Sequence, residues 1–278
     1  MKKNIEFDIP LIVEKNQEIN SKKKDFICIK TNDTNNKSDG IIFFKPEICC
    51  IPSNNLSSIL HYFKEMIKLY KINLQSIYII SGNFLIKNKI IDQNYEAIKK
   101  HSLFHTKKGD NSNPLLFYIL DVYDCNEVIG GLFLIHKGYS PEFLMELWMN
   151  SGPVIKIDDD FYGVECLLND KKIFLVNGFF PYQIQQYKLF DSKIIFFTFN
   201  TKEQFSTLKK YFQGSVESIG RHKFSLRHYL SEFMEKNLIG KLTSSCNGIH
   251  LSASREEGIK EANIFINALN KRLDSREY

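Results

Sequence analysis

His250 lies in a segment whose residue types and spacing suit phosphoryl transfer. The segment N-G-I-H-L-S-A-S runs from Asn247 to Ser254, and Glu261 follows the histidine by eleven residues, about three helical turns. Ser254 and Glu257 form an S-x-x-E capping box, which predicts that a helix starts directly after the histidine. Because a helix N-terminus attracts anions, a phosphate group could be delivered to His250. The alternative is a histidine with a purely structural role.

The elements that would position this segment alternate between strands and helices. Apolar runs predict strands over residues 25–30, 41–45, 76–82, 152–157 and 192–199. Helical spacing of apolar residues predicts helices over 56–70, 88–101, 141–149 and 255–270. Two β-rich runs in 115–135 predict a hairpin, and 161–180 predicts a helix and a turn followed by the strand KIFLV. The alternation with a hairpin indicates an α/β protein with a mixed sheet.

Composition narrows the class of protein. The 278 residues are 43% hydrophobic and 25% charged, which is typical of a globular domain and excludes a disordered, collagen-like or coiled-coil chain. No apolar run approaches the ~20 residues of a membrane helix, so no membrane contact is expected. Glu6 and Asp8 interrupt the apolar stretch that a signal peptide would need, which favours a cytoplasmic protein. A net charge of +5 is too small to predict a nucleic-acid partner.

The six cysteines do not predict a metal site or a disulfide framework. No C-x-x-C motif occurs, and no histidine lies at zinc-ligand spacing from a cysteine pair. We expect free buried thiols in a cytoplasmic chain.

Five segments resemble motifs of the nucleoside diphosphate kinases, in that family's order. The segment around His250 resembles the active-site signature N-x-x-H-G-S-D-S, which precedes a helix with a glutamate. The family's strand that ends in K-P-D is matched by I-I-F-F-K-P-E (41–47), and its segment with the active-site tyrosine by N-Y-E-A-I-K-K-H-S-L-F (94–104). The family's S-G-P-V start of a strand is matched by M-N-S-G-P-V-I-K-I (149–157), and its T-I-R segment by S-L-R-H-Y-L (225–230).

The resemblance implies a ferredoxin-like α/β sandwich with a mixed or antiparallel sheet covered by helices. Residues 1–40 would form an N-terminal appendage, and residues 41–278 one kinase-like domain. Insertions near 105–140 and 182–224 lie outside the matched motifs. Family members are often homo-oligomers, so self-association is possible, although the insertions could block it.

The resemblance also implies a mechanism and a role for each residue. His250 would attack the γ-phosphate of a nucleoside triphosphate, with ATP as the expected donor, and pass the phosphoryl group to a diphosphate acceptor. Glu261 would orient its ring, Lys45 would neutralise phosphoryl charge, and Tyr95 would donate a hydrogen bond. Mg²⁺ would arrive with ATP, so no protein metal site is expected. The expected nucleotide-binding residues are Arg227 for phosphate, Asn247 for ribose, Ser252 beside the histidine, and Phe104 for the base.

The sequence departs from the family pattern at the phosphate clamp. Leu251 and Ala253 replace a glycine and an aspartate after the nucleophile, and we expect Leu251 either to crowd the site or to redirect the chain. No arginine precedes Arg221, so Lys171 or Lys172 would replace the clamp arginine, and Phe179 stands where a threonine is expected. Two alternatives therefore stay open: a kinase of the same fold with a specialised acceptor, and an inactive nucleotide-binding or scaffold protein.

Overall fold

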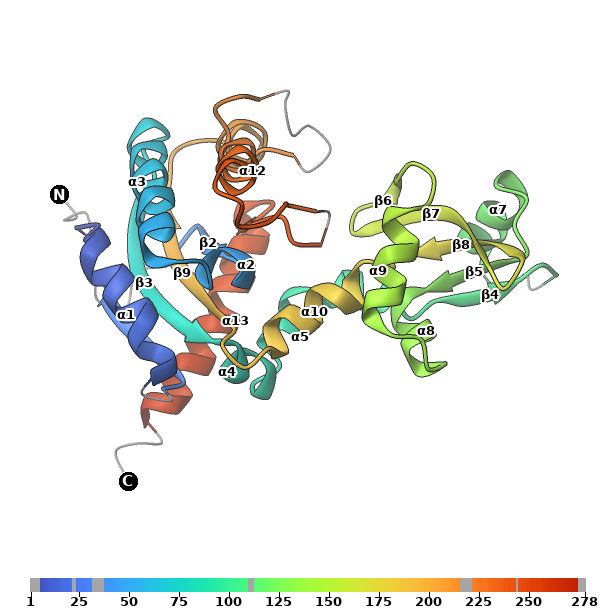
Figure 1. Cartoon of the computed structure of the whole chain (residues 1–278), viewed down its shortest axis with the longest axis horizontal. Coiled ribbons are helices and arrows are strands. Elements are labelled where there is room, and N and C mark those ends of the chain that lie inside the picture. The colour runs from blue at the N-terminus through green and yellow to red at the C-terminus, as the bar shows by residue number, and fades with distance from the viewer. Residues whose placement is uncertain are drawn as a thin grey trace. The chain divides into compact units, whose positions relative to one another are not determined.

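The chain divides into two compact units, which are described separately. The computed structural model describes residues 6–21, 24–31, 38–109, 113–215, 222–243 and 245–274. The first unit comprises residues 1–90 and 186–278, and the second unit comprises residues 91–185 (Figure 1). Each unit contains one five-stranded sheet, so the chain is an α+β protein.

The first unit is built on an antiparallel sheet with the strand order β1-β3-β9-β2-β10. In chain order, these strands are β1 (Phe26–Thr31), β2 (Gly40–Phe44), β3 (Asn73–Ser81), β9 (Lys193–Asn200) and β10 (Ile249–Leu251). The helices are α1 (Ile9–Ser21), α2 (Pro46–Cys49), α3 (Ser53–Leu69), α4 (Gly82–Lys87), α11 (Phe205–Thr207), α12 (Leu226–Lys236) and α13 (Arg255–Asp274). A π-helix, η1 (Leu208–Gln213), continues from α11.

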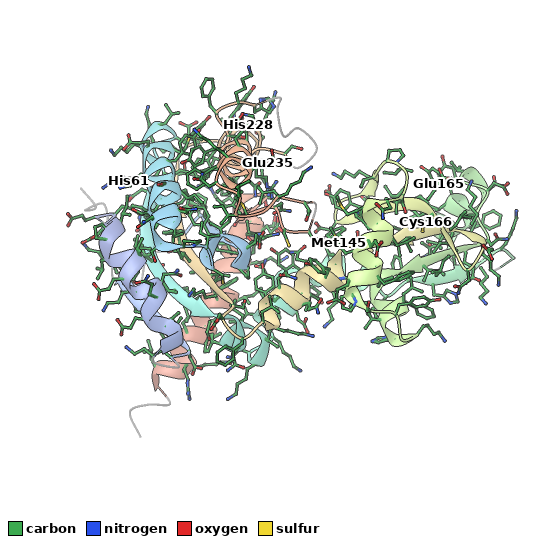
Figure 2. All side chains as sticks on the ribbon, viewed as in Figure 1. His61, Met145, Glu165, Cys166, His228 and Glu235 are labelled. Carbon is green, nitrogen blue, oxygen red and sulfur yellow. The ribbon has the colours of Figure 1, made fainter. Side chains whose placement is uncertain are left out.

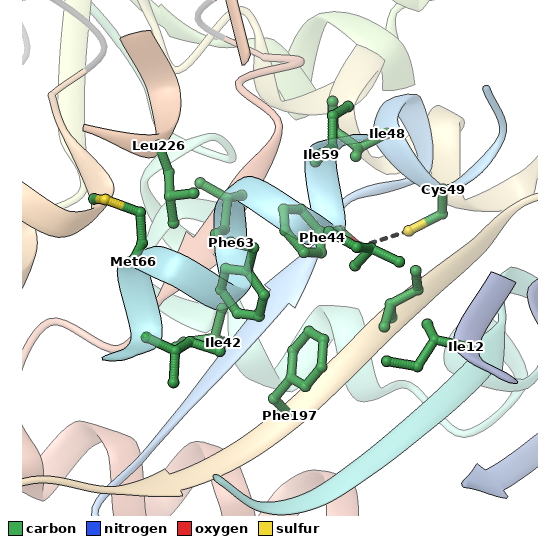
Figure 3. Packing of buried hydrophobic residues seen from close by; sticks show 14 of the residues in the cluster. Ile12, Ile42, Phe44, Ile48, Cys49, Ile59, Phe63, Met66, Phe197 and Leu226 are labelled. Carbon is green, nitrogen blue, oxygen red and sulfur yellow. Dashed lines mark hydrogen bonds between the residues drawn. The ribbon is translucent and has the colours of Figure 1, made fainter. Parts of the chain in front are cut away.

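The two faces of this sheet are covered by different helices. On one face, α1, α3 and α12 bury a large apolar core, in which Phe44, Phe63 and Phe197 meet (Figure 3). On the other face, Phe265 of α13 stacks on Phe196 with 4.4 Å between ring centroids. Side chains alternate between the faces along each strand, so successive residues of one strand reach different helices.

The second unit contains a mixed sheet with the order β4-β5-β8-β7-β6. Only the β5–β8 pair within it is parallel. In chain order, its elements are α6 (Glu96–His101), β4 (His105–Lys107), α7 (Pro114–Val122), β5 (Glu127–Gly130), α8 (Gly131–His136), α9 (Pro141–Met149), β6 (Ile155–Asp158), β7 (Phe161–Leu168) and β8 (Lys171–Val176). The short helix α5 (Ile90–Asn94) and α10 (Phe180–Lys188) cross the two boundaries of the unit in sequence.

Several predicted elements are confirmed, and two predictions are wrong. The strands at 25–30, 41–45, 76–82 and 192–199 and the helices at 56–70, 141–149 and 255–270 are present. The hairpin predicted over 115–135 is instead α7, β5 and α8, because the Asn113 side chain accepts hydrogen bonds from two backbone amides and starts a helix. The helix predicted after residue 161 is instead β7, which pairs with β8 from Gly163 to Leu168.

The predicted appendage and insertions occupy the following places in the fold. Residues 1–40 include α1 and β1, and β1 is a strand of the first sheet. The segment 105–140 lies within the second unit, whereas 182–224 includes β9, a central strand of the first sheet. Across the described ranges, no helix combines the length and the apolar character needed to cross a membrane.

Candidate active site around His250

His250 occupies the middle of β10, the edge strand of the first sheet. Its partner in the register is Phe43 of β2, and the two rings stack with centroids 4.6 Å apart and planes inclined by 12°. The flanking residues Ile249 and Leu251 are fully buried in the core on the opposite face. The alternation along β10 therefore presents the imidazole on the α13 side of the sheet, where its side chain is 14% exposed.

Glu261 of α13 fixes the orientation and the tautomer of this imidazole. His250 Nε2 and Glu261 Oε1 are 2.8 Å apart, and the Glu261 side chain is only 4% exposed. Burial raises the pKa of Glu261, but the charge and hydrogen bond of His250, with Ser252 and Lys209, outweigh burial and lower the pKa overall. An ionised carboxylate only accepts hydrogen bonds, so Nε2 carries the proton and the neutral ring has its lone pair on Nδ1.

Close packing of α13 against β2 brings Glu261 within reach of His250. A Cβ atom at Gly258 would lie 2.4 Å from Asp39 O, so only glycine allows this approach. Ser254 caps the helix, because its Oγ accepts a hydrogen bond from Glu257 N at 3.1 Å, as the capping box predicts. Ser252 Oγ accepts from Ile41 N at 2.9 Å and holds the chain between β10 and α13.

Lys45 is a buried cation on the same face of the sheet as His250. It follows Phe43 by two residues in extended backbone, and its N–H donates to Gly248 O at 3.0 Å. Its exposed fraction is only 4%. Burial lowers the pKa of Lys45 from 10.5 to about 8; Glu47 opposes this shift, whereas the positive charges of Arg227 and Lys209 reinforce it.

Side-chain donors cover the outer edge of β10 on both sides of His250. Ile249 O accepts hydrogen bonds from Gln213 Nε2 at 3.2 Å and from Arg227 Nη2 at 3.1 Å. Leu251 O accepts from Lys209 Nζ at 2.6 Å. Lys209 and Gln213 belong to η1, and π-helical turns occur frequently at functional sites. This edge therefore brings two cations to the strand that carries the histidine.

Arg227 binds the protein's own loops as well as β10. Its Nη1 donates to Gly214 O at 2.8 Å, its Nε to Asn247 O at 3.3 Å, and its Nη2 to Asn247 Oδ1 at 3.2 Å. The two residues predicted to bind phosphate and ribose thus contact each other. In this geometry they join the end of η1 to the segment that leads into His250.

The predicted site residues are divided between the two units. Lys45, Arg227, Asn247, Ser252 and Glu261 lie with His250 in the first unit. The second unit contains the other predicted residues, which are Tyr95, Phe104, Lys171, Lys172 and Phe179.

In the second unit, these side chains take part in local packing and ion pairs. Tyr95 packs edge-on against Phe180, with ring centroids 6.3 Å apart. Lys172 pairs with Glu165, which is labelled in Figure 2, at 2.8 Å. Lys172 Nζ also donates to Tyr123 O at 2.7 Å.

The expected crowding of the site by Leu251 needs correction. Leu251 does not crowd the histidine, because its side chain is buried in the core on the other face. The S-G-P-V match leads into β6, which belongs to the second unit. Of the two cations that donate hydrogen bonds to β10, Arg227 was predicted as a site residue and Lys209 was not. The sequence feature that could have pointed to Lys209 is its position about ten residues after the predicted strand 192–199.

No family model, curated protein or solved structure matches this chain. Within the described ranges, no cluster of three or more His, Cys, Asp or Glu side chains is arranged to hold a metal ion. The candidate site consists of an imidazole hydrogen-bonded to a buried carboxylate, at a sheet edge to which a lysine and an arginine donate hydrogen bonds.

Proposed function

We propose that this protein is a phosphotransferase that carries a phosphoryl group on His250, from a nucleoside triphosphate to a nucleoside diphosphate. ATP is the expected donor. The observation that carries the proposal is the 2.8 Å contact between His250 Nε2 and the buried Glu261 carboxylate. This contact supports a nucleophilic Nδ1, since it selects the tautomer whose lone pair lies on that atom.

The transfer would proceed in two balanced half-reactions. The Nδ1 lone pair attacks the γ-phosphorus, an N–P bond forms, and the bond to the β–γ bridging oxygen breaks, so the nucleoside diphosphate leaves with that electron pair. The Nε2 proton stays hydrogen-bonded to Glu261, which stabilises the positive charge on the phosphohistidine ring. An oxygen of the acceptor then attacks the phosphorus and the N–P bond breaks. Mg²⁺ enters with its nucleotide as part of the substrate.

Two lysines could offset the charge on the transferring group. Lys45 lies on the histidine's face of the sheet, and Lys209 bonds to the carbonyl of the next residue along β10. Preorganised cations beside a phosphoryl group supply much of the catalysis in phosphoryl transfer.

The topology of the first unit supports a ferredoxin-like, nucleoside-diphosphate-kinase-like fold, which forms part of the proposal. The succession β2–α3–β3–β9–α12–β10 alternates as strand, helix, strand, strand, helix, strand. Their spatial order is β3-β9-β2-β10, and each neighbouring pair is antiparallel. The second unit enters this succession between β3 and β9 in sequence.

A specialised acceptor is the second candidate function. Its support comes from Arg227, whose guanidinium group donates hydrogen bonds to Gly214, Asn247 and Ile249 of the protein itself. Lysines would then carry phosphate recognition, and a lysine is less selective than arginine for the geometry of a diphosphate. An inactive scaffold would not need the pair between His250 and Glu261.

The test is acid-labile labelling of the protein by γ-labelled ATP with Mg²⁺. We expect labelling of the full chain and its loss in His250→Asn. The matched control is His105→Asn, because His105 Nε2 also lies near a carboxylate, 3.1 Å from Glu127 Oε2, in the second unit. Label retained in His250→Asn would contradict the proposal. Chasing the label with several nucleoside diphosphates, and then with other phosphate acceptors, distinguishes the two candidate functions.

A further inference from the structure

Glu47 connects the buried lysine to the segment that leads into His250. It lies in the first turn of α2, directly after Pro46. Its Oε1 accepts a hydrogen bond from Gly248 N at 2.8 Å, while Gly248 O accepts one from Lys45 N at 3.0 Å. Gly248 has φ +80°, a left-handed conformation that favours glycine. The β2–α2 junction thus fixes both backbone groups of a residue two positions before the histidine.

The same carboxylate is the negative charge that acts on the Lys45 ammonium. Charged or titratable groups affect Lys45 from four elements: Glu47 of α2, Arg227 of α12, Lys209 of η1 and Cys246 of the loop before β10. Arg227 and Lys209 are cationic. Burial raises the pKa of the Cys246 thiol to about 12, so this group is neutral at physiological pH. Of these four groups, only Glu47 can therefore balance the lysine.

Lys45 and Glu47 each affect the pKa of the other. Burial raises the pKa of Glu47, and the positive charge of Lys45 opposes that shift. A buried charge is costly unless an opposite charge accompanies it, so each of the two groups favours the ionised form of the other.

We propose that Glu47 is a positioning residue for the reaction at His250, which holds the backbone at Gly248 and keeps the Lys45 ammonium charged. The catalytic part of this inference rests on the proposed function. The carboxylate itself would not touch the transferred group. It would act through Lys45, which must be protonated to neutralise phosphoryl charge. The loss of that proton would then limit the reaction on the alkaline side.

The variants separate the charge of Glu47 from its hydrogen bond. Glu47→Gln keeps the length of the side chain and an oxygen that can accept from Gly248 N, but it removes the charge. Glu47→Asp keeps the charge. Glu65→Gln is the matched control, because Glu65 pairs with Lys68 at 2.7 Å on the exposed surface of α3.

The first measurement is the pH profile of phosphoenzyme formation, with each rate divided by the same variant's rate at pH 6.5. Losing a nearby opposite charge should move the alkaline midpoint, near 8 in the parent protein, down by about one pH unit. The relative rate at pH 8 would then fall about fourfold further in Glu47→Gln than in the parent. Glu47→Asp should recover most of this rate, and Glu65→Gln should match the parent.

The second measurement does not depend on activity. The ¹³Cε resonance of Lys45, assigned by its loss in Lys45→Met, is titrated in the full chain labelled with ¹³C-lysine. Its midpoint should also fall by about one pH unit in Glu47→Gln. An unchanged Lys45 titration in this variant overturns the inference. If the parent forms no phosphoenzyme, the proposed function fails, while this titration still decides whether Glu47 supports Lys45.

Discussion

Replacing Glu261 by glutamine tests the element of the site on which the proposed chemistry depends most. The substitution keeps the size of a side chain that is buried between α13 and β10, so packing changes little. It removes the negative charge beside His250 Nε2. A glutamine amide can also donate to the ring nitrogen, which would stabilise the other tautomer and move the lone pair away from Nδ1.

The expected loss of rate in Glu261→Gln follows from the kind of hydrogen bond that is lost. A hydrogen bond to a charged group contributes about 1.5–3 kcal/mol, and burial at 4% exposure leaves little water to replace it. If this energy stabilises the positively charged phosphohistidine and the transition state leading to it, the rate of phosphoenzyme formation falls about 10- to 100-fold. The affinity for nucleotide should change by less than about threefold, because Glu261 acts on the ring.

Rapid-quench measurement of the first turnover with γ-labelled ATP gives the rate, and nucleotide titration in the His250→Asn background gives the affinity. Glu256→Gln is the control, since Glu256 is an exposed carboxylate in the first turn of the same helix. A first-turnover rate in Glu261→Gln equal to that of the control would refute the reasoning. A large loss of affinity with an unchanged rate would equally refute it, because it would assign Glu261 to substrate binding.

Two further predictions concern the packing around the site. Leu251→Ala should lower the free energy of unfolding by about 2–5 kcal/mol without increasing phosphoenzyme formation, because Leu251 is buried in the core. Denaturant unfolding and γ-phosphate labelling measure the two effects. Faster labelling in this variant would mean that Leu251 does crowd the site. Gly258→Ala should lower both the thermal unfolding midpoint and the labelling rate, because the new Cβ would lie 2.4 Å from Asp39 O. This clash costs about 1–3 kcal/mol, which outweighs the better helix propensity of alanine. An unchanged midpoint would show that α13 can move away from Asp39 freely.

The parts of the fold that were predictable from sequence have strong local signals. The strand at 41–45 is a continuous apolar run that ends at a proline, and the last helix has both a capping box and a regular apolar stripe. The second unit gave weaker signals. Its segment 115–122 is rich in β-branched and aromatic residues, which favour strands, yet an Asn-Pro pair at 113–114 caps a helix there.

The local part of the candidate site was predictable for the same reason. His250, Ser252 and Glu261 lie within twelve residues, and Glu261 belongs to the helix that begins shortly after the strand of His250. The cations come from distant segments, and short motif matches cannot tell which strand will lie beside β2. The four-residue S-G-P-V match lies just before β6 of the second unit, whereas the strands beside β2 are β9 and β10, and Lys209 comes from η1.

The place of the second unit in the sequence has a consequence for the order of folding. Ser81 and Lys193 are partners in the register of β3 and β9, although about 110 residues separate them in the chain. During synthesis, β3 must therefore wait for β9, and the strand that carries His250 is made later still. The second unit has its own core, and its last residue is made before β9 and β10 are. We infer that the histidine site forms last, and that slow closure of such distant strand pairs limits its appearance.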